Sequence, residues 1–484
     1  VKGRAGPDGK WKVRFPGLAK NTSFDINITT GEGEEKVIRN AVAGQVWLCS
    51  GQSNMGMPVS ASDVKEKLKD SDVHEIRFFL AQNDPSATEL HRLTGHWVIC
   101  TTQTIGSCSA VGLSFAWNLH QHLRQPVGLI INAVGGTPIE SWTPLTTVKE
   151  KAYNIHVFQE RAQWQRDRNV YEKEYQLKLK NREIAVQQAR EEGRPLPPKI
   201  YPPFALRENW NPGSLYNSLV CPVRDFVFKG IIWYQGESNA NYPFVYRYQL
   251  ADMIRCWRKL FNKKKLPFYI IQLPDYQCAD DWAVIRESQA SVGSLNDTRL
   301  IVTLGLGDSL NIHPVRKMEV GRRVSLQVLR KEYGYDLVAS GPRLKKMEIT
   351  GEKIRLSFDC SGSLIKSSDG RPLRNMEISD DGLVFFPAQV RIDRNTLLVW
   401  SDKIKHPGMV RYAWKNVPEP INFVNQDGLP APPFFSGGKE QHILMEKNER
   451  KNNLGSADQG RRKIPQIIRD FYSGVRKGTE AGPA

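Results

Sequence analysis

Five short apolar runs, separated by stretches with helical spacing, constrain the fold of this chain more than any other feature of its sequence. The runs lie at residues 46–48, 127–131, 231–234, 268–271 and 300–304. Strands that are buried on both faces have this largely apolar composition, whereas a strand with one exposed face alternates apolar and polar residues. Such strands alternating with helices predict an α/β fold in which a parallel sheet is covered by helices on both faces.

The patterns divide the 484-residue chain into four regions. Residues 1–40 alternate apolar and polar positions between Pro and Gly, which predicts a partial β-sandwich. Residues 41–335 carry the α/β pattern, interrupted by a charged segment at 153–199 whose spacing predicts one or two surface helices. A lid or a partner-binding arm is the alternative for this insert. Residues 336–440 predict a β-rich region packed on the α/β domain, and residues 441–484, basic and poor in apolar side chains, predict a disordered tail.

Composition and charge exclude several classes of protein. The formal net charge is +17, but the basic residues are spread along the chain without a nucleic-acid motif, so we expect no nucleic-acid partner. No apolar stretch is long enough to span a membrane. The seven cysteines show no CxxC pairing, so we expect no metal or redox motif. The first residues lack Met and an apolar signal core, so we expect a mature or truncated form.

Ser53 is the first candidate for a catalytic residue. It follows the first apolar run in a turn of small and polar residues, 50–54. Placed at the carboxyl end of a parallel sheet, where α/β folds bind ligands, its hydroxyl can act as a nucleophile. Its backbone N–H then points into the same space and can stabilise an oxyanion. Serine also caps helices at such positions, so the turn alone does not decide between the two roles.

Two further blocks follow predicted strands. Gly135 and Gly136 come after the run at 127–131, and paired glycines let a backbone N–H approach a substrate carbonyl closely. Gln235 and Glu237 follow the run at 231–234. The amide of Gln235 is a candidate oxyanion donor, and we expect Glu237 to contact the substrate or neighbouring loops. Each block taken singly is equally compatible with an ordinary turn.

The block after the last predicted strand of the sheet supplies a base. A serine nucleophile needs a group that takes its proton, and the pKa of histidine near neutrality suits this role. The chain has nine histidines, and His313 alone lies directly after a predicted core strand in a loop that also carries an acid, Asp308. An acid that orients the imidazole completes the usual arrangement. All four blocks therefore meet at one edge of one sheet.

These four blocks resemble the SGNH hydrolase superfamily and, within it, the sialate O-acetylesterase family. The resemblance covers about residues 40–435. The motifs that carry it are Gly51-Gln52-Ser53-Asn54-Met55, Gly135-Gly136-Thr137-Pro138-Ile139-Glu140, Trp233-Tyr234-Gln235-Gly236-Glu237-Ser238-Asn239 and Ile312-His313-Pro314. It implies a three-layer α/β/α hydrolase with β-rich additions, and hydrolysis of acetyl esters on carbohydrates without a metal or organic cofactor. It also implies an exported protein with an extracellular, periplasmic or lysosomal location.

The resemblance assigns roles to the candidate residues. Ser53 attacks the acetyl carbonyl, and the oxyanion donors are the Ser53 N–H, an N–H of Gly135 or Gly136, and the amide of Gln235. One position departs from the family, because many relatives carry Asp two residues before the histidine, where this chain has Asn311. Two arrangements therefore stay open. Either Asp308 completes a triad, or the enzyme uses a Ser–His dyad.

The substrate is constrained less than the mechanism. Aromatic side chains commonly face sugars, and Trp142, Trp233 and Tyr242 are the candidates near the blocks. An acetylated sialic acid is the expected substrate. Acetylated xylan or another polysaccharide is the alternative within the enzyme class, and a carbohydrate-binding protein that has lost catalysis is the alternative outside it. The sequence leaves the oligomeric state open.

Overall fold

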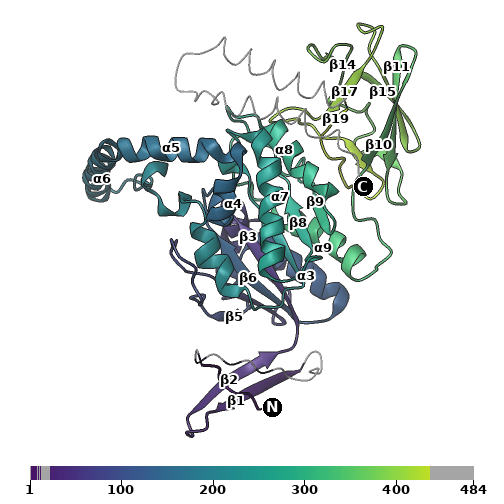
Figure 1. The fold of residues 1–484 in the computed structure, drawn as a ribbon. Helices are drawn as coiled ribbons and strands as arrows, with labels where there is room; N and C mark the ends of the chain where they lie inside the picture. The colour runs from purple at the N-terminus through teal and green to yellow at the C-terminus, as the bar shows by residue number, and fades with distance from the viewer. Residues whose placement is uncertain (1, 8, 10, 12, 14–21, 437–484) are drawn as a thin grey trace.

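A seven-stranded sheet forms the centre of the chain (Figure 1). The computed structural model describes residues 2–7, 9, 11, 13 and 22–436. The strand order is β5-β4-β6-β3-β7-β8-β9, and every neighbouring pair is parallel except β4 and β5. The strands are β3 (Gln45–Gly51), β4 (Ile76–Leu80), β5 (Trp97–Ile99), β6 (Val127–Ala133), β7 (Gly230–Tyr234), β8 (Phe268–Ile271) and β9 (Thr298–Ile301). The five apolar runs correspond to β3, β6, β7, β8 and β9, and β4 and β5 extend one edge.

Helices cover both faces of this sheet. Side chains alternate between the faces along a strand, and two neighbours on β8 show which helices lie where. Phe268 packs against Trp257 of α7, whereas Tyr269 packs against Trp47 and donates a hydrogen bond to Glu332 of α9. The helices concerned are α3 (Ala110–Leu123) and α9 (Lys317–Glu332) on one face, and α7 (Pro243–Leu260) and α8 (Trp282–Ser291) on the other. The expected three-layer α/β/α fold is confirmed.

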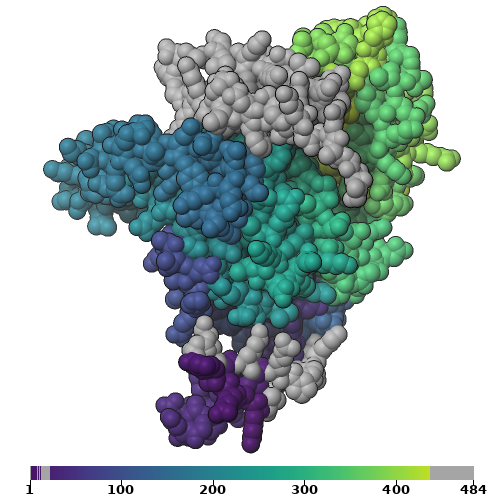
Figure 2. Space-filling view, in the orientation of Figure 1, coloured from purple at the N-terminus to yellow at the C-terminus, as the bar shows by residue number. Residues whose placement is uncertain are grey.

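Two segments extend from the sandwich. The charged insert forms α5 (Ile155–Arg166) and α6 (Arg168–Glu191), which stand out as a separate lobe in Figures 1 and 2. Near the N-terminus, β1 (Ser23–Thr29) and β2 (Glu35–Val42) form an antiparallel hairpin at the opposite end of the molecule from the C-terminal strands. The remaining short helices of the sandwich are α1 (Ser53–Gly56), α2 (Val64–Leu68) and α4 (Leu145–Glu150).

The C-terminal region is rich in strands and has its own apolar core. One sheet contains β10 (Arg343–Thr350), β11 (Lys353–Asp359), β16 (Thr396–Trp400) and β15 (Gln389–Asp393); a second contains β14 (Phe386–Pro387), β13 (Met376–Ser379), β17 (Met409–Tyr412) and β19 (Phe434–Ser436); and β12 (Ile365–Ser367) pairs with β18 (Phe423–Asn425). The tail expected at 441–484 lies outside the described residues.

A buried arginine joins this region to the catalytic sandwich. Arg286 on α8 is fully buried and donates hydrogen bonds to the carbonyl oxygens of Lys415 and Asn416, each at 2.8 Å. Its guanidinium also lies 3.4 Å from the carboxylate of Asp275, which accepts a hydrogen bond from the N–H of Gly305. Because Gly305 begins the segment that leads to His313, the β-rich region helps to hold one end of that loop.

Three further features bear on the functional class. None of the helices in the described part of the chain has the length and apolar character needed to cross a membrane. All seven cysteines are free thiols. Among the residues that the structure describes, no group of three or more His, Cys, Asp or Glu side chains is arranged to hold a metal ion.

Gly51, at the end of β3, is a position where we expect substitution to be costly. Its φ is +140°, and a Cβ atom there would overlap the carbonyl oxygen of Tyr234 on β7. We expect Gly51→Ala to lower the free energy of unfolding by about 2–5 kcal/mol, because backbone strain and overpacking add. Urea denaturation measures this loss. Gly293→Ala, where a Cβ meets no atom within 4 Å, is the control, and an equal effect of both substitutions would contradict the argument.

Candidate active site

The expected nucleophile lies where β3 ends and a helix begins. β3 ends at Gly51, and α1 begins with Ser53. Ser53 is partly buried, and the residues on both sides of it, Gln52 and Asn54, are buried. The hydroxyl of Ser53 therefore sits at the carboxyl edge of the parallel strands, which is the edge where α/β folds bind their ligands.

Ser53 and His313 are hydrogen-bonded although 260 positions separate them in the sequence. The distance between Ser53 Oγ and His313 Nε2 is 2.7 Å. Burial lowers the pKa of His313, and the nearby charge of Lys317 lowers it further. A histidine with a lowered pKa is neutral near pH 7, and the neutral ring is the form that can take a proton from serine. The fold therefore brings together the two residues that the sequence singled out.

The carboxylate of Asp308 does not orient the imidazole of His313. Its Oδ1 accepts hydrogen bonds from the N–H groups of Leu310 (2.9 Å) and Asn311 (3.2 Å), and the residue is exposed. Within residues 22–436, no ion pair joins His313 to a carboxylate. An Asp that closes a turn in this way has its carboxylate engaged by the backbone. The expected role of Asp308 in a triad is thus not supported, and the geometry is that of a Ser–His dyad.

Hydrogen bonds to the backbone hold the histidine loop instead. Asn311 Oδ1 accepts from the N–H of His313 at 2.9 Å. Asn54, which follows the nucleophile, donates from Nδ2 to the carbonyl oxygen of Ile312 at 3.0 Å and to Glu237 Oε1 at 2.6 Å. Lys317 Nζ donates to Asn54 Oδ1 at 2.6 Å. Asn54, the residue after the nucleophile, is therefore hydrogen-bonded to Ile312, the residue before the base.

Glu237 acts within this network. Its Oε1 accepts from Asn54, whereas its Oε2 is buried and has no hydrogen-bond partner among the described residues. Burial raises the pKa of Glu237, although the hydrogen bond from Asn54 and the charge of Lys317 oppose the rise. The position of Glu237 is that of a group that fixes neighbouring loops, which was one of the two roles expected for it.

Gly135 lies against the nucleophile. A Cβ atom built on Gly135 would stand 3.4 Å from the Cβ of Ser53, so the loop after β6 passes directly beside the serine. Gly136 follows with a φ of +64°, a conformation that glycine adopts without strain. The loop that carries the two glycines therefore borders the nucleophile, and the role of their N–H groups as oxyanion donors stays a prediction.

Gln235 has a different role from the expected one. Its side chain is fully buried, and its Nε2 donates to the carbonyl oxygen of Thr137 at 3.1 Å and to Asn239 Oδ1 at 2.8 Å. Its Oε1 accepts from the hydroxyl of Tyr246 at 2.8 Å. A primary amide has two N–H donors, and both are used here. Gln235 thus braces the loop that carries the glycines and is not available as an oxyanion donor.

Trp142 and Trp233 also lie away from any substrate surface. Both are fully buried, and their rings pack edge to face with centroids 5.7 Å apart. A ring with no exposed face cannot stack on a sugar, so their expected role in substrate binding is not supported. Tyr242 is also largely buried, but it lines a pocket, where its hydroxyl donates to Glu160 Oε1 at 2.8 Å.

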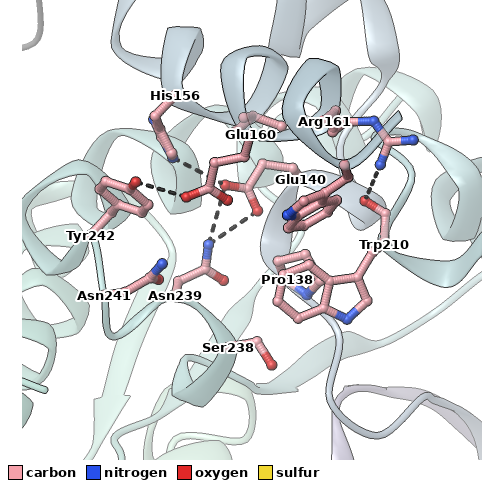
Figure 3. A pocket seen from close by; sticks show the side chains of 12 residues that line it. Pro138, Glu140, His156, Glu160, Arg161, Trp210, Ser238, Asn239, Asn241 and Tyr242 are labelled. Atoms are coloured by element: carbon pink, nitrogen blue, oxygen red, sulfur yellow. Dashed lines mark hydrogen bonds and ion pairs between the residues drawn. The ribbon is translucent and has the colours of Figure 1, made fainter. Parts of the chain in front are cut away.

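This pocket lies between the insert and the loop that continues from the glycines (Figure 3). Asn239 donates to Glu140 at 3.0 Å on one side, and Arg161 donates to the carbonyl oxygen of Trp210 at 3.2 Å on the other. The lining combines acidic, amide and aromatic side chains: Pro138, Glu140, His156, Val157, Glu160, Arg161, Trp164, Trp210, Ser238, Asn239, Asn241 and Tyr242. Most of these side chains are polar or charged, and neither Ser53 nor His313 is among them.

Comparison with known proteins identifies the family. The family model described as "Carbohydrate esterase, sialic acid-specific acetylesterase" matches residues 43–172 and 205–330. The chain belongs to this family. The sialate O-acetylesterase of Mus musculus is 27% identical over 471 residues, which cover 89% of this chain and 82% of the mouse protein. The sialate O-acetylesterase of Homo sapiens is 26% identical, with coverage of 89% and 80%.

A solved structure agrees with this assignment. A carbohydrate acetylesterase from Xanthomonas citri superposes with a TM-score of 0.74 and 30% sequence identity, covering 89% of each chain. As a member of the sialic acid-specific acetylesterase family, the chain is a carboxylic ester hydrolase that acts on acetylated carbohydrates. The family resemblance drawn from the four sequence blocks is confirmed.

Sequence reasoning missed two residues of this acetylesterase site. Lys317 is fully buried next to Asn54, and its position at the start of α9, where the helix dipole disfavours a cation, was an available signal. Arg207 lies beside Gly136, but it belongs to an irregular segment after the insert. No periodicity or strand end points to such a residue.

Proposed function

We propose that this chain hydrolyses acetyl esters on sialic acid, with Ser53 as the nucleophile and His313 as the general base. The observation that carries the proposal is the 2.7 Å contact between Ser53 Oγ and His313 Nε2. The close approach of Gly135 to Ser53 supports it, because an acyl-transfer site needs donors for the oxyanion beside the nucleophile. Similarity to mammalian sialate O-acetylesterases supports the choice of sugar.

The reaction proceeds in two acyl transfers. His313 Nε2 takes the proton of Ser53 Oγ while Oγ forms a bond to the acetyl carbon, and the carbonyl oxygen becomes an oxyanion. When the intermediate collapses, the bond from the acetyl carbon to the sugar oxygen breaks, and the imidazolium gives its proton to that oxygen. A water molecule then loses a proton to His313 and attacks the acetyl group. Collapse returns that proton from His313 to Ser53 Oγ and releases acetic acid, which then loses its proton to water to give acetate.

Backbone N–H groups of Ser53 and of Gly135 or Gly136 supply the oxyanion stabilisation in this proposal. Each such donor is worth about 2.7–4 kcal/mol of barrier in comparable sites. Because both N–H groups of the Gln235 amide are engaged elsewhere, its contribution is to hold the position of the loop. In this scheme the hydrogen bonds of its loop position His313, and burial and the charge of Lys317 keep the ring neutral before it accepts the proton.

An acetylated polysaccharide such as xylan is the second candidate substrate. The structural similarity to the Xanthomonas citri carbohydrate acetylesterase supports it, because that name covers acetylated carbohydrates without naming sialic acid. The contact between Ser53 and His313 weighs against a binding protein that has lost catalysis. A location outside the cytoplasm or in lysosomes accompanies the proposal as an expectation from the family resemblance.

Acetate release together with covalent labelling tests the function. We expect the enzyme to release acetate from 9-O-acetylated sialic acid faster than from acetylated xylan. We also expect an organophosphate to abolish this activity by phosphorylating Ser53, because the hydrogen bond to His313 activates that hydroxyl. Mass spectrometry of the labelled peptide locates the phosphoryl group, and urea-unfolded protein is the unlabelled control. Label on another residue, or full labelling of Ser53 with activity retained, would refute the mechanism.

A further inference from the structure

Arg207 belongs to the segment after the insert, and its side chain lies against the loop that carries the glycines, at the edge of the candidate active site. Its Nη1 would be 3.3 Å from a Cβ atom built on Gly136, while a Cβ atom on the preceding Gly135 would be 3.4 Å from the Cβ of Ser53. Consecutive Cα atoms are about 3.8 Å apart. The guanidinium and the nucleophile therefore contact neighbouring residues of one loop.

The position of Arg207 is fixed by a chain of contacts that ends on the same loop. Its Nε donates to the carbonyl oxygen of Pro202 at 2.6 Å, and its guanidinium lies over the ring of Phe204 at 4.6 Å. Phe204 stacks on Trp210 with ring centroids 4.2 Å apart. Trp210 Nε1 donates to the carbonyl oxygen of Gly136 at 2.5 Å. These contacts hold both the Nε and the planar face of the Arg207 guanidinium. Because the side chain is preorganised, less conformational entropy is lost when it binds a ligand.

The terminal nitrogens of Arg207 are left for a ligand. In the described part of the chain, no carboxylate forms an ion pair with this residue, and its Nε is the nitrogen that makes a hydrogen bond within the protein. The residue is partly buried, and burial lowers the pKa of its guanidinium. A partly buried cation is unfavourable unless an anion compensates it. The planar guanidinium of an arginine presents two parallel N–H donors, which match the two oxygens of a carboxylate.

We infer that Arg207 binds the carboxylate of the acetylated sugar and so selects an acidic sugar over a neutral one. This inference rests on the proposed function, because it assigns the substrate of the Ser53–His313 site. The acetyl group enters beside Gly135, and the carboxylate of the same sugar meets the guanidinium beside Gly136. A neutral acetylated sugar has no carboxylate, so it cannot form the ion pair with Arg207.

The test compares one substrate with and without its negative charge. The substrates are 9-O-acetylated sialic acid and its methyl ester, with acetate release as the readout, and the variants are Arg207→Gln and Arg207→Lys. We expect the wild type to have a kcat/KM at least about 10-fold higher for the free acid, and Arg207→Gln to lower that value by about 10–100-fold through KM, as loss of a hydrogen bond to a charged group predicts. For the methyl ester, the Arg207→Gln substitution should lower kcat/KM far less. The ratio of kcat/KM for the free acid to that for the methyl ester should therefore approach one. Arg207→Lys keeps the positive charge but lacks the two parallel N–H donors. Its kcat/KM for the free acid should therefore lie between those of the wild type and Arg207→Gln.

Control reactions separate failure of this inference from failure of the proposed function. Arg168→Gln, which removes an exposed arginine paired with Glu172 on α6, should behave as wild type. Equal losses on both substrates in Arg207→Gln, or a wild type that does not prefer the free acid, would overturn the role of Arg207 while leaving the esterase intact. Release of acetate from xylan but not from sialic acid would overturn both the role of Arg207 and the sialate assignment. Inactivity towards sialic acid, xylan and p-nitrophenyl acetate alike would overturn the serine mechanism.

Discussion

Replacing Ser53 by alanine is expected to lower kcat for acetate release by about 10⁴-fold or more. The substitution removes the atom that forms the acyl bond, and the imidazole of His313, which lies 2.7 Å from that atom, loses its proton donor. Binding of the sugar does not depend on the hydroxyl, so KM should change little. Acetate release from 9-O-acetylated sialic acid at saturating substrate measures the effect.

The control for this prediction is Ser50→Ala, on the strand β3 that leads to Ser53. Ser50 is fully buried and donates to the carbonyl oxygen of Asn132 at 2.9 Å, away from the nucleophile. Its loss should cost about 1 kcal/mol of stability and leave kcat near the wild-type value. His313→Ala should match Ser53→Ala, and the double variant should be no slower than either, because the two residues act as a unit. Ser53→Ala with kcat within about tenfold of wild type would contradict the assignment of the nucleophile.

Replacing Lys317 by methionine is expected to lower kcat/KM by about 10–100-fold, the penalty for misplacing reacting groups by about an ångström. Lys317 is fully buried and can only donate hydrogen bonds, so it forces Asn54 Oδ1 to face it and Asn54 Nδ2 to face Ile312 and Glu237. Without Lys317, Asn54 Oδ1 loses its donor, and only the two hydrogen bonds from Asn54 Nδ2 to Ile312 and Glu237 remain to hold the carbonyl before His313. Turnover of p-nitrophenyl acetate measures the loss.

The pH profile separates this positioning role from a structural one. The positive charge of Lys317 is a secondary cause, after burial, of the lowered pKa of His313. Since the base works only when neutral, the acid limb of kcat/KM in the wild type lies below the ordinary pKa of histidine, and Lys317→Met should move that limb to higher pH. The groups that face Lys317 are Glu237, Asp63 and the ring of Tyr234. Burial lowers the pKa of Lys317 itself to about 7, and the two carboxylates oppose this shift.

A second lysine on the same helix provides the control. Lys331 lies in the last turn of α9 and is exposed. Lys331→Met should leave both kcat/KM and the acid limb unchanged between about pH 4 and 8. If Lys317→Met and wild type share the same acid limb, Lys317 does not act on His313 electrostatically. If activity is also unchanged, the hydrogen bonds through Asn54 do not position the base.

The positions of Ser53 and His313 could be predicted because each depends on a local pattern. Apolar runs mark the strands, and a residue directly after a parallel strand lies at the edge where ligands bind. The same reasoning singled out the glycines of the 135–136 loop, since a glycine pair after a strand is visible in the sequence, and Gly135 lies beside Ser53. It gave the wrong surroundings for Trp142 and Trp233, because an aromatic residue near a catalytic block can equally be part of the core.

The sequence alone therefore determined the parallel α/β sheet, the edge at which the blocks meet and the pairing of a serine with a histidine, since strand composition and strand ends are local properties. Only the tertiary structure decided which polar groups lie free and which are engaged. Asp308 turned out to close a turn and Gln235 to brace a loop, whereas Lys317 and Arg207 came to lie beside the site. The physical reason is that the burial and hydrogen-bond partners of a side chain are set by segments far away in the chain, and no local pattern records them.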